Sequence, residues 1–101
     1  MEVAYTMEGR TLTLKLIGEL DEHAAQYAKN TLDELLEGNF AAVVFDLSRL
    51  SFMDSTGIGV MIGRYKLLKA KNCPIYVKNP SRVVDKIFVM SGLYEIMKKI
   101  Q

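Results

Sequence analysis

Hydrophobic and polar residues alternate along the start of the chain with the two-residue period of β-strands. Residues 3–7 form one such segment, and residues 11–16, with the sequence TLTLKL, form a second. The three residues between them, Glu8-Gly9-Arg10, have the composition of a tight turn. The pattern therefore predicts a β-hairpin with one face toward solvent, ended by Gly18.

A helical pattern follows the hairpin. Apolar residues recur three or four positions apart between Asp21 and Glu37, which predicts a helix over this range. Asp21 is a favoured N-cap residue, and Gly38 is typical of the position just past a helix end. The apolar positions of this helix are Ala24, Ala28, Leu32, Leu35 and Leu36.

Two further strand–helix units occupy the second half of the chain. The apolar run of residues 41–45 predicts a central strand covered on both faces. A helix over residues 56–71 and a short strand over residues 74–77 come next. Pro80 predicts the first turn of a third helix, because its missing N–H costs nothing there, and Gly92 ends this helix. The expected buried side of the third helix comprises Val83, Val84, Ile87, Phe88 and Met90.

The order of these elements predicts the fold class. Strands that alternate with helices are joined by right-handed crossovers, which place the strands in one parallel or mixed sheet with the helices packed on it. Residues 93–101 would add a helical turn and a final strand. No linker, repeat or low-complexity tract divides the chain, so we expect a single α/β domain over residues 1–101.

Composition narrows the possible functions. Half of the 101 residues are hydrophobic, a quarter are charged and the net charge is +1, which is the balance of a soluble globular domain. The lysines are scattered among acids, so binding of nucleic acid by a basic face is not expected. Neither a signal peptide nor a bilayer-spanning run is evident, so we expect a cytoplasmic protein without membrane contact. The single cysteine, Cys73, cannot form an internal disulfide, and no metal or cofactor site is expected.

The segment Asp54-Ser55-Thr56 leads directly into the predicted second helix. All three residue types cap helices, and the commoner interpretation is that one of them does so here. The free N–H groups of a helix N-terminus also favour anions, so a phosphorylation site is a second interpretation. A Ser55–His23–Asp21 triad would be a third, but the sequence lacks a G-x-S-x-G nucleophile elbow, so an enzyme is not favoured.

The predicted second helix contains three glycines, Gly57, Gly59 and Gly63. They do not follow a strand immediately, as a dinucleotide-binding fingerprint requires, so they give nucleotide binding only weak support. At about 100° per residue, Val60 and Leu67 fall next to Gly59 and Gly63 on the outer face, where another protein could approach closely. Coverage by another part of the same chain is the alternative. The residues expected to face the sheet are Ile58, Met61, Ile62, Tyr65 and Leu68.

Three motifs resemble those of the STAS-domain anti-sigma-factor antagonists, bacterial proteins that release sporulation or stress sigma factors. The long central motif is SFMDSTGIGVMIGRYK, residues 51–66. Gly18-Glu19-Leu20-Asp21 resembles the family's second motif, and Met90-Ser91-Gly92-Leu93 resembles its third. The motifs stand in the family's order, so the resemblance extends over nearly the whole chain.

The resemblance implies a single STAS-like domain, with a small mixed β-sheet and helices packed mainly on one face. It implies that Ser55 is the phosphorylated serine and that Asp21 and Asp54 are the acids beside it. The expected partner is an anti-sigma factor with ATP-dependent serine kinase activity, which docks on this loop and the following helix. The unphosphorylated form would bind this factor and free its sigma factor, phosphorylation would switch binding off, and a serine phosphatase would restore it. The expected partner-binding residues are Thr56, Gly57, Gly59, Val60, Gly63, Arg64 and Leu67.

The resemblance leaves a second hypothesis open. STAS-like domains also occur as sensor modules that bind nucleotides or other small molecules. Under the first hypothesis the protein is a monomer that binds another protein and holds no cofactor. Under the second it binds a small molecule, so the kind of molecule that binds distinguishes the two.

Overall fold

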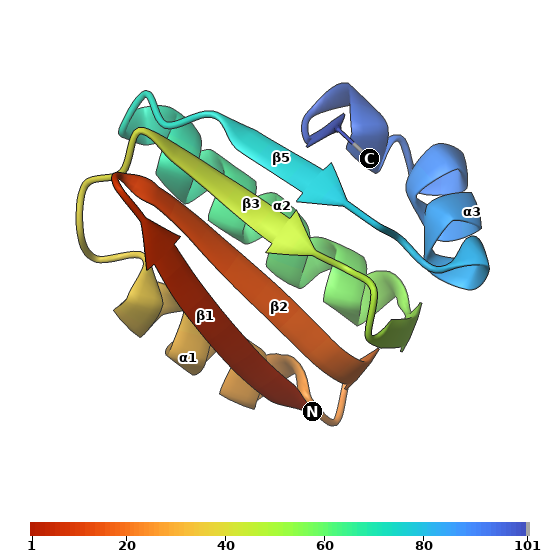
Figure 1. Ribbon diagram of the computed structural model, residues 1–101. Helices are drawn as coiled ribbons and strands as arrows, with labels where there is room; N and C mark the ends of the chain where they lie inside the picture. The colour runs from red at the N-terminus through yellow and green to blue at the C-terminus, as the bar shows by residue number, and fades with distance from the viewer. Residues whose placement is uncertain (101) are drawn as a thin grey trace.

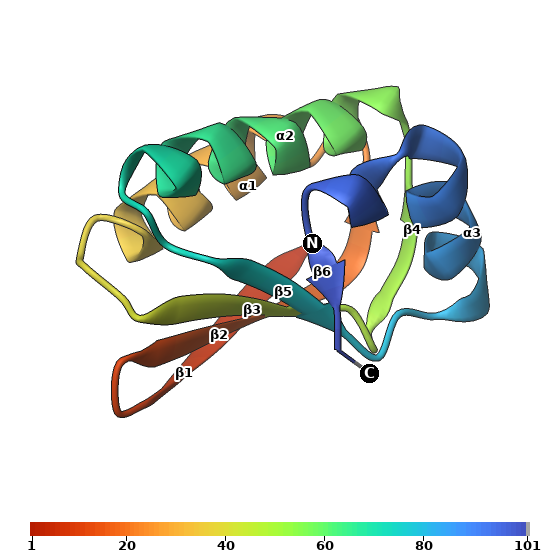
Figure 2. The same ribbon diagram turned by 90° about the horizontal axis from the view of Figure 1, so that it is seen from above.

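Six strands form one mixed sheet and three α-helices pack against it in the computed structural model, which describes residues 1–100. In chain order the elements are β1 (Glu2–Glu8), β2 (Thr11–Leu20), α1 (Ala25–Leu35), β3 (Ala42–Asp46), β4 (Leu50–Met53), α2 (Ser55–Ala70), β5 (Ile75–Lys78), α3 (Arg82–Ser91), the 3-10 helix η1 (Leu93–Glu95) and β6 (Lys98–Lys99). Helices α1 and α2 lie side by side over one face of the sheet, and α3 stands at the end of the sheet beside β4 (Figure 1, Figure 2). None of the helices in this range is long and apolar enough to cross a membrane.

The sheet is antiparallel at its first hairpin and parallel elsewhere. The strand order is β1-β2-β3-β5-β6, with β1 antiparallel to β2 and the other neighbours parallel. The register aligns Leu14 of β2 with Phe45 of β3 and Val77 of β5. All three side chains are fully buried under the helices, so this row lies at the centre of the core. The predicted hairpin and the predicted α/β class with a mixed sheet are confirmed.

Strand β2 is longer than predicted and changes its partner along its length. Residues 11–15 pair with β3, whereas residues 18–20 pair with β4 after an irregularity between Gly18 and Glu19. Gly18 has a φ of 108°, which side-chain-bearing residues rarely adopt, and its N–H donates to the Arg49 carbonyl at 3.0 Å. Gly18 therefore bends the strand and does not end it. The sequence predicts a loop where β4 forms, because four residues are too few to show a strand pattern without their partner.

Helix α1 begins at Ala25, later than the predicted start after Asp21. Residues 21–24 form a turn, in which the Asp21 carboxylate accepts the backbone N–H groups of His23 at 3.1 Å and Ala24 at 3.0 Å. Asp21 therefore holds a turn that precedes the helix, because its short side chain can satisfy backbone donors two and three residues ahead.

The start of helix α3 also differs from the prediction. The helix begins at Arg82 and not at Pro80, because Ser81 is extended and its hydroxyl accepts the Val84 N–H at 3.3 Å. A serine N-cap thus outweighs the preference of proline for the first helical turn.

One side of α3 faces the core and the others do not. Val84 and Phe88 are buried, as the sequence predicts. The prediction that Val83 and Met90 are also buried is wrong, since these residues are 51% and 82% exposed. The helix stands at the end of the sheet, so the sheet and its neighbours cover only part of its circumference (Figure 2).

Helix α2 is rotated about its axis by roughly 100°, one residue position, from the orientation that the sequence predicts. Its buried residues are Gly57, Val60, Met61 and Leu68, and Val60 is only 1% exposed. The prediction that Val60 lies on the outer face is therefore wrong. Apolar residues lie around most of this helix, and α1 covers a second side of it, so spacing alone does not define the face that meets the sheet.

Gly57 explains this rotation. A Cβ atom on Gly57 would lie 2.0 Å from the carbonyl oxygen of Leu20 at the end of β2, which is far inside van der Waals contact. The backbone of α2 therefore approaches β2 at a point where a side chain has no room. A Cβ atom on Gly59 or Gly63 would meet open space, so these two glycines face outward as predicted.

We expect Gly57→Ala to lower the free energy of unfolding by about 1–3 kcal/mol, the usual cost of forcing extra volume into a filled contact. Gly59→Ala and Gly63→Ala are matched controls in the same helix. Each control should raise the free energy of unfolding by up to about 1 kcal/mol, because alanine favours a helix interior over glycine. Urea denaturation followed by circular dichroism measures all three variants. Equal stability of Gly57→Ala and Gly59→Ala would show that the contact with Leu20 does not hold α2 in place.

Candidate functional site

Two acids reach the same edge of the sheet because the strands before them are paired. Leu20 at the end of β2 and Met53 at the end of β4 are parallel partners. Asp21 and Asp54 follow these residues directly in the sequence. Parallel strands end at the same edge, so the structure brings both acids, which are far apart in sequence, to the start of α2.

The Asp54 carboxylate joins two segments of backbone. Its Oδ1 atom accepts the N–H of Gly57 at 2.9 Å, which caps α2. Its Oδ2 atom accepts the N–H of Glu22 at 3.1 Å, in the turn before α1. Asp54 also has the extended backbone of an N-cap residue, with φ −103° and ψ −171°. Of the three candidate capping residues, Asp54 is the one that caps the helix.

These hydrogen bonds keep Asp54 charged. The N–H of Gly57, with a smaller effect from the N–H of Glu22, holds the pKa of the Asp54 carboxyl below its ordinary value. A negative charge at this place also interacts favourably with the partial positive charge of the helix N-terminus. Asp54 is therefore an ionised group with both of its oxygens directed at backbone donors.

Ser55 is the first residue of α2, and it is exposed. Because Asp54 caps the helix, the Ser55 hydroxyl is not required for that role. The first turn of α2 contains no acidic residue, and its backbone N–H groups carry a partial positive charge. A negatively charged group attached to Ser55 would thus be tolerated by the free protein.

The expected partner-binding residues divide into two groups. Thr56 and Gly59 are exposed, and Gly63 has open space above it, so these three lie on the outer face of α2. Gly57 and Val60 are buried against the sheet and α1, which removes them from any surface that a partner could reach. The rotation of α2 accounts for both outcomes.

Arg64 and Leu67 both make contacts within the domain. The Nε atom of Arg64 is 3.2 Å from Oδ1 of Asp33 in α1, and the Arg64 side chain is only 12% exposed. Leu67 is half-buried and packs against the core. These contacts lie within the domain, which corrects the prediction of a docking face over Arg64 and leaves Leu67 only partly accessible.

The Ser55–His23–Asp21 triad is not assembled. The Asp21 oxygen that would orient an imidazole ring accepts the backbone N–H groups of His23 and Ala24 instead. His23 lies in an exposed turn. Asp21 thus orders the backbone of this turn and does not orient a base toward Ser55.

An apolar groove, which the sequence does not predict, lies beside Ser55. It has a volume of about 360 Å³, and residues of β4, α2 and α3 line it. Its apolar lining residues are Phe52, Met53, Ile58, Ile87 and Met90. The sequence carries a signal for it, an apolar stripe at positions 83, 87 and 90, but such a stripe is normally assigned to the core.

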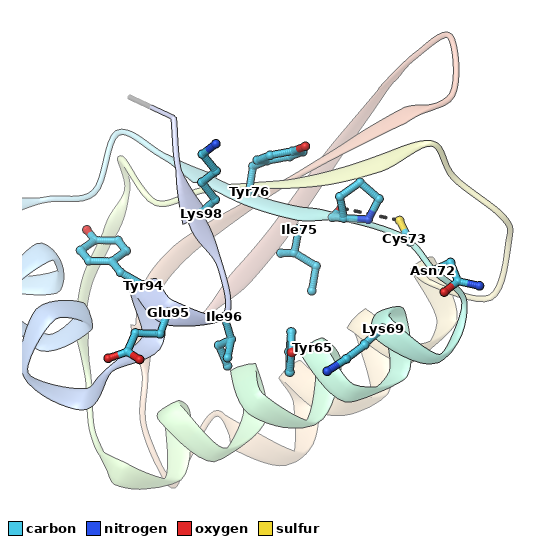
Figure 3. A pocket seen from close by; sticks show the side chains of 11 residues that line it. Tyr65, Lys69, Asn72, Cys73, Ile75, Tyr76, Tyr94, Glu95, Ile96 and Lys98 are labelled. Atoms are coloured by element: carbon cyan, nitrogen blue, oxygen red, sulfur yellow. Dashed lines mark hydrogen bonds between the residues drawn. The ribbon is translucent and has the colours of Figure 1, made fainter.

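A larger cleft lies toward the other end of α2. It has a volume of about 670 Å³ between α2, β5 and η1, where Ile75 and Ile96 point toward the side of α2 that carries Tyr65 and Lys69 (Figure 3). This volume is within the range of small-molecule sites. Tyr65 lies about 15 Å beyond Ser55 along the helix axis, at a rise of about 1.5 Å per residue, so the cleft is separate from the Ser55 site.

The fold is a small α/β domain with two helices on one face of a mixed sheet. The second of these helices, α2, is capped at its start and begins with an exposed serine. The chain belongs to the STAS-domain family, whose family model matches residues 2–101. It is 38% identical over 87 residues to the anti-sigma F factor antagonist of Paenibacillus polymyxa, which covers 85% of this chain and 74% of the relative. It is 25% identical over 97 residues to the anti-sigma-B factor antagonist of Staphylococcus aureus, which covers 96% and 90% of the two chains.

Solved structures agree with this assignment. The anti-sigma factor antagonist SpoIIAA in its unphosphorylated form superposes with a TM-score of 0.80 at 33% identity, over 99% of this chain and 89% of SpoIIAA. The Bacillus protein SpoIIAA in its phosphorylated form superposes with a TM-score of 0.72 at 32% identity, over 99% and 92% of the two chains. The family and the fold that the motifs imply are therefore confirmed.

The lowered pKa of Asp54 leads to a prediction about stability and pH. The ionised carboxylate stabilises the fold fully above the ordinary aspartate pKa of 3.8, and this contribution is lost as the pH falls through the lower pKa of the folded state. The difference in unfolding free energy between the wild type and Asp54→Asn should therefore be larger at neutral pH than at about pH 3. Urea denaturation at both pH values measures it.

Ser55→Ala is the control for this prediction, because it changes the next residue without adding or removing a titratable group. Its difference from the wild type should be the same at both pH values. If the difference in unfolding free energy between the wild type and Asp54→Asn is also the same at both pH values, the hydrogen bonds from Gly57 and Glu22 do not favour the charged carboxylate.

Proposed function

We propose that the protein is an anti-sigma-factor antagonist, whose unphosphorylated form binds an anti-sigma factor and frees the sigma factor that it holds. The relatives described above are antagonists of this kind, so the similarity supports a binding regulator and not an enzyme. The higher identities, 38% and 36%, are with anti-sigma F factor antagonists, which favours an anti-sigma F factor as the partner. The observation that carries the proposal is the exposed Ser55 at the capped start of α2.

Phosphorylation of Ser55 would switch this binding off. A phosphate adds a charge of about −1.5 to −2 directly beside the ionised Asp54. In the free protein, water and the N-terminus of α2 offset this charge. In a complex the phosphate and the Asp54 carboxylate would lose their water, and their repulsion would be larger because water no longer screens it. This difference between the free and bound states is what a switch requires, and the similar SpoIIAA has a phosphorylated form.

The docking surface in this proposal is the outer face of α2 together with the loops around Asp21 and Asp54. Thr56, Gly59 and Gly63 would contribute small groups there, which permit a close approach by a partner. The anti-sigma factor would itself carry the ATP-dependent serine kinase activity, and a serine phosphatase would remove the phosphate. The protein would act in the cytoplasm as a monomer without a cofactor.

The cleft between α2, β5 and η1 is the observation that favours a second candidate function, a STAS-type sensor for a small molecule or nucleotide. Such a ligand would raise the thermal unfolding temperature of the wild type and not that of Tyr65→Ala, in which one wall of the cleft is removed. If ATP or GTP raises the unfolding temperature of the wild type but not of Tyr65→Ala, and the protein has no affinity for an anti-sigma factor, the sensor function is supported and the antagonist function is contradicted.

Incubation with Mg-ATP and the purified anti-sigma F factor of Paenibacillus polymyxa should add one phosphate, on Ser55. The reason is that Ser55 carries an exposed hydroxyl at the first residue of the capped helix, directly after Asp54. Tandem mass spectrometry locates the modified residue, and Ser55→Ala should remain unmodified. A phosphate found mainly on Thr56 or Ser51 would contradict the assignment.

Two substitutions of Ser55 distinguish the effect of losing the hydroxyl from the effect of adding a negative charge. Ser55→Ala should bind the same anti-sigma F factor as tightly as the wild type, because only a hydroxyl is lost. Ser55→Asp should keep the fold, since acids are favoured at a helix start, but should bind at least about tenfold more weakly because its carboxylate is desolvated beside Asp54. Calorimetry measures the three affinities. Equal values would leave Ser55 without a switching role.

A further inference from the structure

Strand β1 is the outermost strand of the sheet, and one of its two edges has no neighbouring strand within residues 1–100. The strand order starts at β1, which pairs only with β2, and Figure 1 shows it along the open side of the sheet. Its seven residues pair with β2 in one continuous register. An unpaired edge of this length presents a row of backbone N–H and C=O groups to which another strand can bind.

The hairpin turn determines which backbone groups face the free edge. The turn has two residues, 9 and 10, and the first is a glycine with a φ of 59°, as a type II′ turn requires. Such a turn closes on a hydrogen-bonded pair, which here is Glu8 and Thr11. Hydrogen-bonded and non-hydrogen-bonded pairs then alternate along the two strands. The residues whose N–H and C=O groups point toward the free edge are therefore Val3, Tyr5 and Met7.

These residues also carry exposed apolar side chains. Tyr5 is paired with Leu14 and Met7 with Leu12, so both lie on the face of the sheet where Leu12 and Leu14 are buried under the helices. The cover ends before the edge of the sheet, since Tyr5 is 61% exposed and Met7 is 49% exposed. A strand that paired with β1 could therefore satisfy the free backbone groups and pack its own side chains on Tyr5 and Met7 at the same time.

The middle of β1 lacks the usual protection of an exposed edge. Soluble proteins commonly interrupt such an edge with a proline, a bulge or a charged residue. The segment from Val3 to Met7 contains none of these, and the only charges of the strand are Glu2 and Glu8 at its two ends. An open edge of this kind is suited to β-augmentation, in which a partner adds an extended segment to an existing sheet.

The charges at the ends of β1 indicate which strand fits. A second copy in an antiparallel register over all seven residues would place Glu2 opposite Glu8 twice. Like charges directly opposite each other destabilise a sheet. A foreign strand with a lysine or arginine at each end would place a cation opposite each glutamate. Neither glutamate has an ion-pair partner in the described part of the chain, so both carboxylates are available.

We propose that the free edge of β1 is a second docking site, which accepts an extended segment of a partner protein with alternating apolar residues and a cation at each end. The segment runs antiparallel to β1, which is the slightly more stable pairing, and places its apolar side chains beside Tyr5 and Met7. The groove beside Ser55 is lined by β4, α2 and α3, so β1 takes no part in it. The inference therefore goes beyond the proposed function and does not depend on it.

A synthetic peptide of seven residues, KVTVTVK, acetylated and amidated at its ends, tests the site. Its lysines would stand opposite Glu2 and Glu8, and its valines beside the apolar side chains of β1. We expect it to bind with a Kd below about 1 mM at low salt, and EVTVTVE to bind at least about tenfold more weakly. Titration followed by NMR measures both affinities. Equal affinities would overturn the preference for cations, and no binding of either peptide would overturn the docking site.

Amide hydrogen exchange shows where the peptide binds. With KVTVTVK at about ten times its Kd, the N–H groups of Tyr5 and Met7 should exchange about tenfold more slowly, because the peptide then occupies most of the protein. The N–H groups of Ala4 and Thr6 should change by less than about twofold, since they already bond to β2. Equal slowing at all four positions, or none, would contradict binding at the free edge.

Tyr5→Lys and Thr6→Lys are a matched pair of variants. Both add one cation to β1 at an exposed position, but only Tyr5 lies on the face that the valines would cover. Tyr5→Lys should bind KVTVTVK at least about fivefold more weakly than Thr6→Lys. Both variants should unfold at the temperature of the wild type, because both side chains are exposed. Equal affinities of the two variants would overturn the proposal.

Two further outcomes separate this site from the alternatives. Ser55→Asp should bind KVTVTVK as tightly as the wild type, and a loss of binding would mean that the peptide occupies the Ser55 site. Sedimentation should show a monomer. A dimer of the wild type that Tyr5→Lys abolishes would mean that the edge binds a second copy of this chain, which would also overturn the proposal.

Discussion

The contact between the first turn of α2 and the end of β2 determines the geometry of the candidate site. Gly57 places only backbone against the Leu20 carbonyl oxygen, and the same oxygen accepts the Asp54 N–H at 3.4 Å. With α2 held at this distance, the Asp54 carboxylate reaches the N–H groups of Gly57 and Glu22. The next residue, Ser55, then faces solvent. One steric constraint thus sets the cap, the position of the charge and the exposure of the hydroxyl.

Both oxygens of the Asp54 carboxylate accept hydrogen bonds from backbone N–H groups, which affects how a phosphate on Ser55 would act. A carboxylate that is hydrogen-bonded on both sides cannot turn away from a new negative neighbour without giving up those bonds. A phosphate on Ser55 would therefore face a fixed charge, and the domain would not need to refold for its binding properties to change. The switch would act through the different cost of desolvating these groups in the free and bound states.

The end of the chain holds α3 in the position that shapes the groove. The Tyr94 hydroxyl donates to the Asp85 carboxylate, and Lys99 Nζ lies 2.8 Å from the same group. The hydrogen bonds from Lys99 and Tyr94 hold the pKa of the Asp85 carboxyl below its ordinary value. The Tyr94 ring also packs on Phe88 at a centroid distance of 5.1 Å. These contacts tie one flank of α3 to η1 and β6, which leaves its opposite flank facing Phe52 and Ser55.

The local features of this protein were readable from the sequence, whereas the choice of exposed surface was not. The hairpin, the buried strand β3 and the hydroxyl-rich start of α2 follow from short-range patterns of polarity and capping residues, so they could be predicted. The rotation of α2 could not, because its apolar residues surround the helix and the deciding contact is with the carbonyl of Leu20. The partner of Arg64 is likewise on another helix. The sequence places the apolar Met90 at helical spacing from other apolar residues, but only the packing of the other elements decides whether its side chain is covered.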